Sequence, residues 1–415
     1  MQIITALLII VSTSKAATTT TTTQEWKQDR FAISFWVDPI VPVTQFNYEY
    51  SRIAQANFTV LLGGFGATTP DTVKLQIAAA KQNNLAPIPS ICNGKCANLK
   101  GAWGFQITDE PPVSEFNNVA KLVADAKAAG QMAFVNLLPN YATPTQLGAA
   151  TYGDYLSIYM KIVKPNILCV DHYPNFDETT TSNKTKKGYI LNLLALRKAS
   201  MSVTPSLPFW NFFNSMPYQS YYDVSESQLR WQIWTSVAIG SRGVLYFCYW
   251  TPNGFTKGQA IMTPTPSNAP MSSISIANQS PSHKYYMVQR INSKLKVLGN
   301  WLLKKNSSAV VQTSGVKSTQ LFNLNWDSIN GSATGPKSEF MLGCYDNNET
   351  VLLVNQDSNH PALATVHFSP WSNGTMYEVD PMSGIASPAL DDAPLMSGFQ
   401  IALIAGDARL FTWIK

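Results

Sequence analysis

The apolar and polar positions between residues 31 and 250 follow two alternating patterns. Short continuous apolar runs are separated by longer segments in which apolar residues recur every three or four positions. The first pattern is typical of strands buried on both faces of a sheet, and the second of amphipathic helices. The runs that predict strands are Phe31–Val37, Phe58–Leu62, Ala86–Ile91, Gly104–Thr108, Ala133–Leu137, Ile167–Val170, Phe209–Phe213 and Gly243–Tyr249.

The intervening segments carry helix signals. The segment after Pro111 and Pro112, for example, ends on Gly130, and helices commonly begin after proline and end at glycine. Strands that alternate with helices in this way predict a parallel (β/α)8 barrel. An open doubly wound sheet is the alternative, but it needs a glycine-rich phosphate loop after the first strand, where this chain has Asp38-Pro39-Ile40. The predicted helices are Thr72–Asn83, Val113–Gly130, Tyr152–Lys164, Lys187–Ser200, Ser225–Gly240 and His283–Lys304.

The pattern changes from Ala309 onward, where short β-rich runs are separated by turn residues. Such a pattern predicts an antiparallel β-sandwich. We therefore expect an α/β fold, a TIM (β/α)8 barrel in residues 30–304, followed by a small all-β sandwich domain in residues 305–415. The predicted sandwich strands are Phe340–Tyr345, Thr350–Asn355, Ala364–Phe368, Met376–Val379, Phe399–Ile404 and Arg409–Trp413.

The N-terminus predicts export. Ile3–Val11 is an apolar run too short to span a bilayer, and Ser14-Lys15-Ala16 resembles a cleavage site, so residues 1–16 are expected to be a signal peptide. Residues 17–29 are a Thr-rich linker. Sequons for N-glycosylation fit a secreted, extracellular protein, although an Asn- and Thr-rich composition also generates them. They lie at Asn57, Asn183, Asn278, Asn306, Asn330, Asn348 and Asn373.

Composition narrows the range of partners. Charged residues are 13% of the chain and hydrophobic residues 45%, so a sizeable core has a surface dominated by uncharged polar groups. The net charge of +5 is scattered, with no basic run beyond Lys184, Lys186 and Lys187. Nucleic-acid binding needs a clustered basic stripe and is not expected. No segment predicts a membrane span.

The five cysteines predict one disulfide. Cys92 and Cys96 flank a turn sequence, and in a secreted protein this spacing favours a small loop disulfide. No second Cys/His pair has the spacing of zinc ligands, so no metal site is expected. Cys169, Cys248 and Cys344 lie in apolar runs and are expected to be buried. Neither a metal nor an organic cofactor is predicted.

Catalytic groups of a (β/α)8 barrel lie at the carboxyl ends of its strands. Carboxylates, amides and aromatic rings are concentrated at these ends. This combination suits saccharides, whose ring faces stack on aromatic groups while their hydroxyls need polar partners. We expect substrate contacts from Trp36, Asp38, Asp109, Asn136, His172, Tyr173, Trp210, Asn214 and Trp250.

The acidic pair after the fourth strand, Asp109-Glu110, is the main catalytic candidate. Glycoside cleavage needs a carboxylic acid to protonate the leaving oxygen and a second carboxylate as nucleophile or base. Asp109 and the barrel environment would raise the proton affinity of Glu110 and suit it to the acid role. The alternative is that Asp-Glu-Pro-Pro only caps the next helix.

Several strand-end motifs resemble those of clan-A-type glycoside hydrolases, near the β-galactosidase-like barrels. They are Gly104-Phe-Gln-Ile-Thr-Asp-Glu-Pro111, Asn136-Leu-Leu-Pro-Asn-Tyr141, Asp171-His-Tyr-Pro174 and the segment from Trp234 to Trp250. Tyr377–Gly384 and Gly406–Phe411 resemble the β-sandwich that often follows such barrels. The resemblance covers most of residues 31–415. It implies that Glu110 is the acid/base.

The chain departs from that clan after strand seven, where the resemblance implies a Glu nucleophile. Pro208–Ser215 contains no carboxylate. Asp171, after strand six, is the first candidate for the partner of Glu110. Asp38 activating water in an inverting reaction is the second, and loss of hydrolysis with retained carbohydrate binding is the third. For both aspartates the alternative is a non-catalytic role, as a ligand of substrate hydroxyls or as a loop cap.

The sequence thus predicts a secreted glycoside hydrolase that acts on an oligo- or polysaccharide by carboxylic acid/base catalysis, with Glu110 and Asp171 as catalytic residues. The stereochemical outcome, retaining or inverting, stays open. The competing hypotheses are a carbohydrate-binding pseudoenzyme on the same fold and a hydrolase of another extracellular polymer, such as a polyester or polyamide.

Overall fold

A computed structural model of the chain describes residues 25–97, 99–176, 184–219, 221–252, 255, 260–264, 279–312, 319–321, 324–326, 329–331, 340–347, 349–366, 375–389 and 399–414. The expected signal peptide, most of the expected Thr-rich linker, and the sequons at Asn183, Asn278, Asn348 and Asn373 lie outside these residues.

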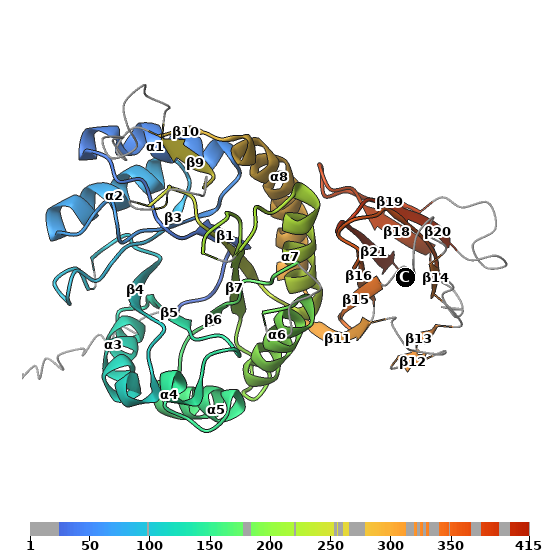
Figure 1. Cartoon of the computed structure of the whole chain (residues 1–415), viewed down its shortest axis with the longest axis horizontal. Helices are drawn as coiled ribbons and strands as arrows, with labels where there is room; N and C mark the ends of the chain where they lie inside the picture. Colours follow the sequence, from blue (N-terminus) through green and yellow to red (C-terminus); the bar gives the residue numbers. More distant parts are fainter. Residues whose placement is uncertain are drawn as a thin grey trace, which may run out of the picture.

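The first part of the chain is a ring of parallel strands surrounded by helices (Figure 1). Its strands are β1 (Ala32–Phe35), β2 (Val60–Leu62), β3 (Ala86–Ile88), β4 (Gly104–Asp109), β5 (Met132–Leu137), β6 (Leu168–Asp171), β7 (Phe209–Asn214) and β8 (Gly243–Phe247). Its helices are α1 (Phe46–Gln55), α2 (Pro70–Gln82), α3 (Phe116–Ala128), α4 (Pro144–Leu147), α5 (Tyr152–Val163), α6 (Lys186–Ser200), α7 (Glu226–Ile239) and α8 (His283–Leu303). Two short 3-10 turns, η1 (Val43–Gln45) and η2 (Val113–Glu115), precede α1 and α3.

The eight strands close into a barrel through backbone hydrogen bonds between neighbouring strands. Six strands pair in the order β1-β8-β7-β6-β5-β4, and β2 pairs with β3. The Thr59 N–H donates to the Ile33 carbonyl (3.0 Å), which joins β1 to β2. The Trp103 N–H donates to the Pro87 carbonyl (2.8 Å), which joins β3 to β4. The expected TIM barrel is therefore confirmed.

Some strands are shorter than the apolar runs predicted. The ladder between β2 and β3 pairs Val60–Leu62 with Ala86–Ile88. Thr59, just before it, bonds to both neighbouring strands, since its N–H donates to Ile33 and its carbonyl accepts from the Ala86 N–H (3.0 Å). The ladder ends at Ile88, one residue before Pro89, which has no N–H to donate to a ladder. β8, which begins at Gly243, ends at Phe247 rather than at Tyr249, the predicted end.

Helix ends follow the local sequence. Ser225 caps the N-terminus of α7 with a reciprocal capping box to Gln228, and Gly240 ends the helix with a left-handed φ of 107°. Thr69 and Pro70 start α2 in the same way. These caps satisfy backbone groups that the helix ends otherwise leave unpaired.

The second part of the chain is antiparallel. Within its described residues the strands are β11 (Ser307–Gln312), β12 (Thr319–Leu321), β13 (Leu324–Trp326), β14 (Ile329–Gly331), β15 (Phe340–Tyr345), β16 (Thr350–Asn355), β17 (Ala362–Val366), β18 (Thr375–Val379), β19 (Ala386–Pro388), β20 (Phe399–Leu403) and β21 (Ala408–Ile414). One sheet has the order β11-β15-β16-β21-β18-β19, and another β14-β17-β20. Phe340, Leu353, Ile401 and Phe411 from both sheets share one apolar cluster, so the β domain is confirmed.

The β domain packs against the barrel through α7, which stands between the two in Figure 1. The Tyr345 hydroxyl donates to the Val237 carbonyl (2.5 Å). A Cβ atom at Gly343 would lie 2.5 Å from the Ala238 carbonyl oxygen, so only glycine allows β15 to approach the helix this closely. Between β8 and α8, the chain forms a small hairpin of β9 (Met262–Pro264) and β10 (Gln279–Pro281).

Candidate active site

A cavity of about 290 Å³ opens at the carboxyl ends of the barrel strands. Residues at or after the ends of β1, β4, β5, β6, β7 and β8 form it, as expected for the catalytic face of this fold. Its lining residues are Trp36, Asp109, Glu110, Asn136, Tyr141, Asp171, Tyr173, Lys184, Phe212, Tyr218, Gln219, Tyr221 and Phe247.

Three carboxyl groups and one amide form a connected cluster on this cavity. The Asn136 Nδ2 donates to Asp109 Oδ1 (3.0 Å) and to Asp171 Oδ1 (3.1 Å). The carboxyl groups of Glu110 and Asp171 are hydrogen-bonded to each other. Two ionised carboxylates have only acceptor oxygens, so this hydrogen bond requires that the pair hold a proton.

Burial raises the pKa of every acid in the cluster, and repulsion by neighbouring carboxylates adds to this for Glu110 and Asp171. Burial raises the pKa of Asp171 well above its usual range, and the charges of Glu110 and Asp109 raise it further. Burial and the Asp109 charge also raise the pKa of Glu110, whereas its hydrogen bond with Asp171 lowers it. Asp171 is the more buried of the two, so it holds the shared proton and Glu110 accepts the hydrogen bond.

The backbone fixes Glu110 in an uncommon conformation. Its φ is 49°, in the left-handed region that residues other than glycine seldom adopt. Its N–H donates to the Asn136 carbonyl (2.8 Å), and the following Pro111 carbonyl accepts a hydrogen bond from the Tyr155 hydroxyl (2.8 Å). Such conformations cost about 1–3 kcal/mol and persist where neighbouring contacts enforce them. The fold thus holds Glu110 at the cavity rather than letting it turn away.

Aromatic rings form the opposite side of the cavity. Trp36 packs edge-on against Phe212 with ring centroids 5.7 Å apart. Tyr218 stacks on Tyr221 at 4.8 Å, and Tyr173 lies 5.2 Å from Phe247. The cavity therefore combines clustered carboxyl groups with apolar ring faces, the two features that a saccharide site requires.

Lys184 brings a positive charge to the cavity. Its ammonium lies 4.9 Å from the centre of the Tyr141 ring and 5.5 Å from that of Tyr221. Burial raises the pKa of Tyr221 to about 12, and the nearby Asp171 charge acts in the same direction. The Tyr221 hydroxyl is thus a neutral hydrogen-bonding group at neutral pH.

The structure brings most of the predicted site residues together. Trp36, Asp109, Glu110, Asn136, Asp171 and Tyr173 all line the cavity. His172 is fully buried beside it, with its ring 5.1 Å from that of Tyr141 and 5.5 Å from that of Tyr189. Asn214 lines a neighbouring cavity instead.

Asp38 does not fit the expected role in substrate binding or water activation. Its side chain is fully buried, and its carboxylate accepts hydrogen bonds from the N–H groups of Phe65 (2.8 Å) and Gly66 (3.1 Å) and from Gln76 Nε2 (2.8 Å). A Cβ at Gly66 would clash with the Pro39 carbonyl oxygen, so this loop is tightly packed. Asp38 ties the ends of β1 and β2 together and is out of reach of a substrate.

Trp210 and Trp250 also lie away from the cavity, although the sequence predicted that they contact substrate. Both are fully buried and absent from the cavity lining. Trp210 lies near the start of β7, where it stacks on Trp103 and its indole N–H donates to Gln28 (3.1 Å), so it belongs to the far end of the barrel. The Trp250 N–H donates to the Val37 carbonyl, which turns the chain into the core after β8.

Several cavity residues were not predicted as site residues. Phe212 and Phe247 are on strands, whereas Lys184, Tyr218, Gln219 and Tyr221 come from the segments after β6 and β7. For Tyr218, Gln219 and Tyr221, the available signal was the density of tyrosines in Met216-Pro-Tyr-Gln-Ser-Tyr-Tyr222. A loop has no regular period, so the sequence alone does not show which of its rings turn inward.

A disulfide joins Cys92 to Cys96 in the loop after β3. Cys169, Cys248 and Cys344 are free and buried. None of the helices in the described part of the chain combines the length and apolarity needed to cross a bilayer.

No protein-family model matches the chain, and no curated protein matches it. Among solved structures, the chain is similar to a glycoside hydrolase of family 5 from Bacteroides vulgatus, with 10% identity over 93% of this chain and 89% of that one and a TM-score of 0.46. It is also similar to a family 51 α-L-arabinofuranosidase from Bifidobacterium longum, with 10% identity over 93% and 95% and a TM-score of 0.44.

A truncated 3-deoxy-D-arabino-heptulosonate 7-phosphate synthase from Thermotoga maritima is similar over 65% of this chain and 88% of that one, with 13% identity and a TM-score of 0.36. One barrel architecture hosts many chemistries. The function of this chain therefore has to be argued from its site.

Proposed function

We propose that this protein is a glycoside hydrolase that uses Glu110 and Asp171 as its catalytic carboxyl groups. The observation that supports this most is the proton-sharing contact between them, placed beside Asp109 in an aromatic-lined cavity at the catalytic end of a barrel. An acid with a raised pKa and an adjacent carboxylate are what glycosidic cleavage needs.

The separation of the two groups bears on the mechanism. Retaining enzymes hold their carboxyl groups about 5–5.5 Å apart and inverting enzymes about 6.5–9.5 Å apart. Glu110 and Asp171 are hydrogen-bonded to each other. This arrangement is nearer to the short separation of a retaining pair than to the wider one that leaves room for a water molecule. We take the retaining reaction as the proposed mechanism.

In this mechanism the glycosidic oxygen replaces Asp171 as the hydrogen-bond partner of Glu110. The shared proton passes through Glu110, the more accessible carboxyl, to the leaving oxygen as the bond from that oxygen to the anomeric carbon breaks. The Asp171 carboxylate bonds to the anomeric carbon. Glu110 then takes a proton from water, the water oxygen bonds to the anomeric carbon, and Asp171 leaves as a carboxylate.

Asn136 has a positioning role in this proposal. Because one amide nitrogen donates to both Asp109 and Asp171, it holds the two carboxylates on the same side of the cavity and limits how far Asp171 turns. Asp109 raises the proton affinity of the pair.

The test is activity against a panel of para-nitrophenyl α- and β-glycosides and of oligosaccharides of several linkages. Turnover by the wild-type protein and its loss in Glu110→Gln are expected. NMR of the first product should show the retained anomer, and a 2-fluoroglycoside should label Asp171 in mass spectrometry. An inverted product would exclude the retaining mechanism, and absence of any turnover would contradict the enzyme proposal.

Carbohydrate binding without hydrolysis is the second candidate. The end of β7 favours it, because Phe209–Asn214 carries no carboxylate where the resembled clan has its nucleophile. Calorimetric binding of an oligosaccharide by a wild-type protein that cleaves none would support this function.

We also propose that the protein is secreted. The expected signal peptide, the sequons and the Cys92–Cys96 disulfide support this. Asn306 is exposed and accessible to glycosylation. Expression of the full chain in a secreting eukaryotic cell, followed by N-terminal sequencing of the medium fraction and glycosidase treatment, tests it. Retention of the protein inside the cell with an intact N-terminus would contradict it.

A further inference from the structure

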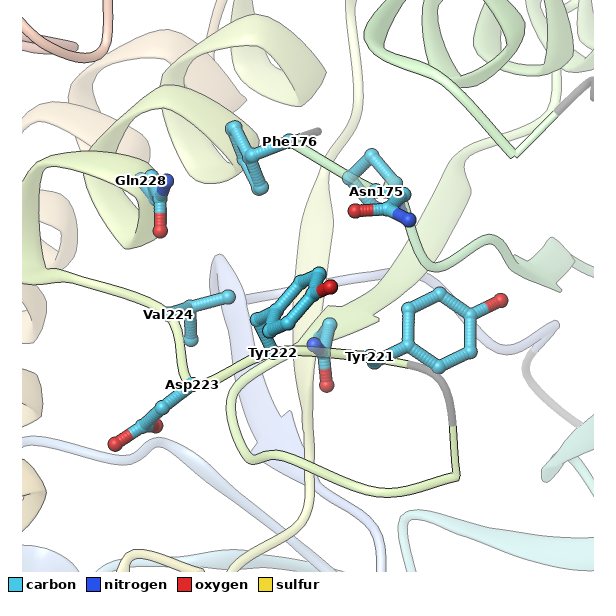
Figure 2. Close-up of a pocket in the computed structure, with 9 residues that line it drawn as sticks. Asn175, Phe176, Tyr221, Tyr222, Asp223, Val224 and Gln228 are labelled. Atoms are coloured by element: carbon cyan, nitrogen blue, oxygen red, sulfur yellow. The ribbon is translucent and has the colours of Figure 1, made fainter. Parts of the chain in front are cut away.

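A second cavity, of about 240 Å³, lies beside the candidate active site (Figure 2). Residues 174–176 after β6 and residues 221–224 after β7 form two of its sides, and Asn214 and Gln228 complete it. Tyr221 lines both cavities. The two spaces are therefore neighbours on the same face of the barrel and share the Tyr221 ring.

Tyr221 borders both cavities. It is buried, stacks on Tyr218, and lies edge-on to Tyr173 with centroids 6.1 Å apart. Its hydroxyl is hydrogen-bonded to that of Tyr141. These contacts place the Tyr221 ring at the border that the two cavities share.

The second cavity repeats the chemistry of the first. The Tyr222 ring is 69% exposed, and in Figure 2 it faces the same space as Asn175 and Gln228. A large aromatic ring left open to solvent beside side-chain amides offers a stacking face and hydrogen-bonding partners together. Such a combination suits a pyranose or furanose ring.

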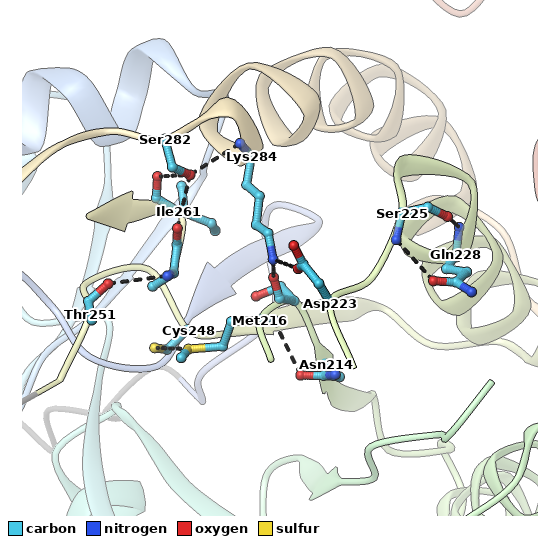
Figure 3. A network of polar contacts seen from close by, with 12 residues as sticks. Asn214, Met216, Asp223, Ser225, Gln228, Cys248, Thr251, Ile261, Ser282 and Lys284 are labelled. Atoms are coloured by element: carbon cyan, nitrogen blue, oxygen red, sulfur yellow. Dashed lines mark hydrogen bonds and ion pairs between the residues drawn. The ribbon is translucent and has the colours of Figure 1, made fainter. Parts of the chain in front are cut away.

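A buried lysine fixes the loop that carries these tyrosines. Lys284, at the start of α8, has no exposed surface, and its ammonium donates to the Ser215 carbonyl (3.1 Å) and to the Asp223 carboxylate (Figure 3). Ser215 and Asp223 are the two ends of the loop that holds Tyr218, Tyr221 and Tyr222. One ammonium thus ties Ser215 and Asp223 together, which reduces the ordering that ligand binding would otherwise require.

We propose that the second cavity is a subsite for a further sugar residue of the same substrate, stacked on Tyr222. This inference rests on the proposed glycosidase function and makes its substrate an oligosaccharide or polysaccharide rather than a small glycoside. The volumes agree with it. Ligand sites usually measure about 300–1,000 Å³. Each cavity alone is smaller than that, whereas the two together fall within the range.

The experiment compares substrates of increasing length. The probes are the para-nitrophenyl monoglycoside and the disaccharide to hexasaccharide of the glycan that the wild-type protein cleaves in the panel. The variants are Tyr222→Ala, Tyr222→Phe, which keeps the ring, and the control Tyr48→Ala, which removes a ring of similar exposure (63%) from α1.

We expect Tyr222→Ala to lower kcat/KM about ten-fold for the longer oligosaccharides, mainly through KM, and to leave the monoglycoside within about two-fold of wild type. Tyr222→Phe and Tyr48→Ala should match wild type on all probes. If Tyr222→Ala cleaves every length as wild type does, the subsite is excluded while the glycosidase function stands. If the wild-type protein cleaves nothing in the panel, the proposed function itself fails.

Discussion

The carboxyl groups of Glu110 and Asp171 meet in a single hydrogen bond although they lie on different strands of the barrel. Glu110 follows β4 and Asp171 ends β6, and Asn136 of the intervening β5 bonds to the latter. β5 thus supplies the amide that holds Asp171 of the neighbouring β6. Loss of either acid should therefore affect the pair as a unit.

Glu110→Gln should lower kcat about 10²–10⁴-fold, the usual contribution of a general acid, because the amide cannot deliver the shared proton. Steady-state kinetics on the best substrate of the panel measure this. The melting temperature should be close to that of wild type, because Glu110 is exposed at the cavity. Glu115→Gln, an exposed neighbour on η2, is the matched control and should retain full activity. Full activity of Glu110→Gln would exclude it as the acid.

Asp109→Asn should shift the pH dependence of activity toward acid. The Asp109 charge raises the pKa of both Glu110 and Asp171, so its removal lowers the pKa at which the shared proton is lost. Activity requires that proton and falls as pH rises through the pKa of the pair. The alkaline limb of kcat/KM should therefore move to lower pH, while the amide oxygen introduced by the substitution still accepts the Asn136 hydrogen bond. An unchanged alkaline limb would mean that groups other than Glu110 and Asp171 control the pH dependence of kcat/KM.

Asp38→Asn should destabilise the barrel without a direct effect on chemistry. The amide cannot accept all three hydrogen bonds of the carboxylate, and each buried donor left unpaired costs about 1–3 kcal/mol. Burial raises the pKa of Asp38 to about 6. The folded wild type binds this proton more tightly than the unfolded chain, so it loses stability as pH rises from about 4 to 6.

The difference in free energy of unfolding between wild type and Asp38→Asn should accordingly be larger at pH 4 than at pH 7. Chemical denaturation at the two values measures it. Equal differences at both would show that Asp38 ionises with the same pKa in the folded and unfolded states.

Lys284→Met should loosen the loop between Ser215 and Asp223. The variant leaves the Ser215 carbonyl without this donor and frees the exposed end of the Asp223 carboxylate, at an expected cost of about 1–3 kcal/mol of stability. Because the loop carries Tyr218 and Tyr221, KM should rise more than kcat falls. Lys296→Met, an exposed position on the same helix, is the control. Thermal unfolding and kinetics together separate this role from a purely structural one, which would leave KM unchanged at a temperature where both proteins are folded.

The sequence by itself determined the order of strands and helices, because buried strands and amphipathic helices have different apolar periods. It also placed Asp109, Glu110 and Asp171 on one face, because parallel barrel strands all end on the same side. It did not determine the direction of each side chain. Asp38 turns into the loop after β2.

Tertiary packing decided the remaining features. Trp210 was expected among the substrate contacts but lies near the start of β7, at the far end of the barrel, where it stacks on Trp103. The contact of Glu110 with Asp171 and the inward turn of Tyr218 and Tyr221 depend on distances between strands and on a loop tied by Lys284. Such contacts join residues far apart in the chain, and no local pattern of apolar and polar positions encodes them.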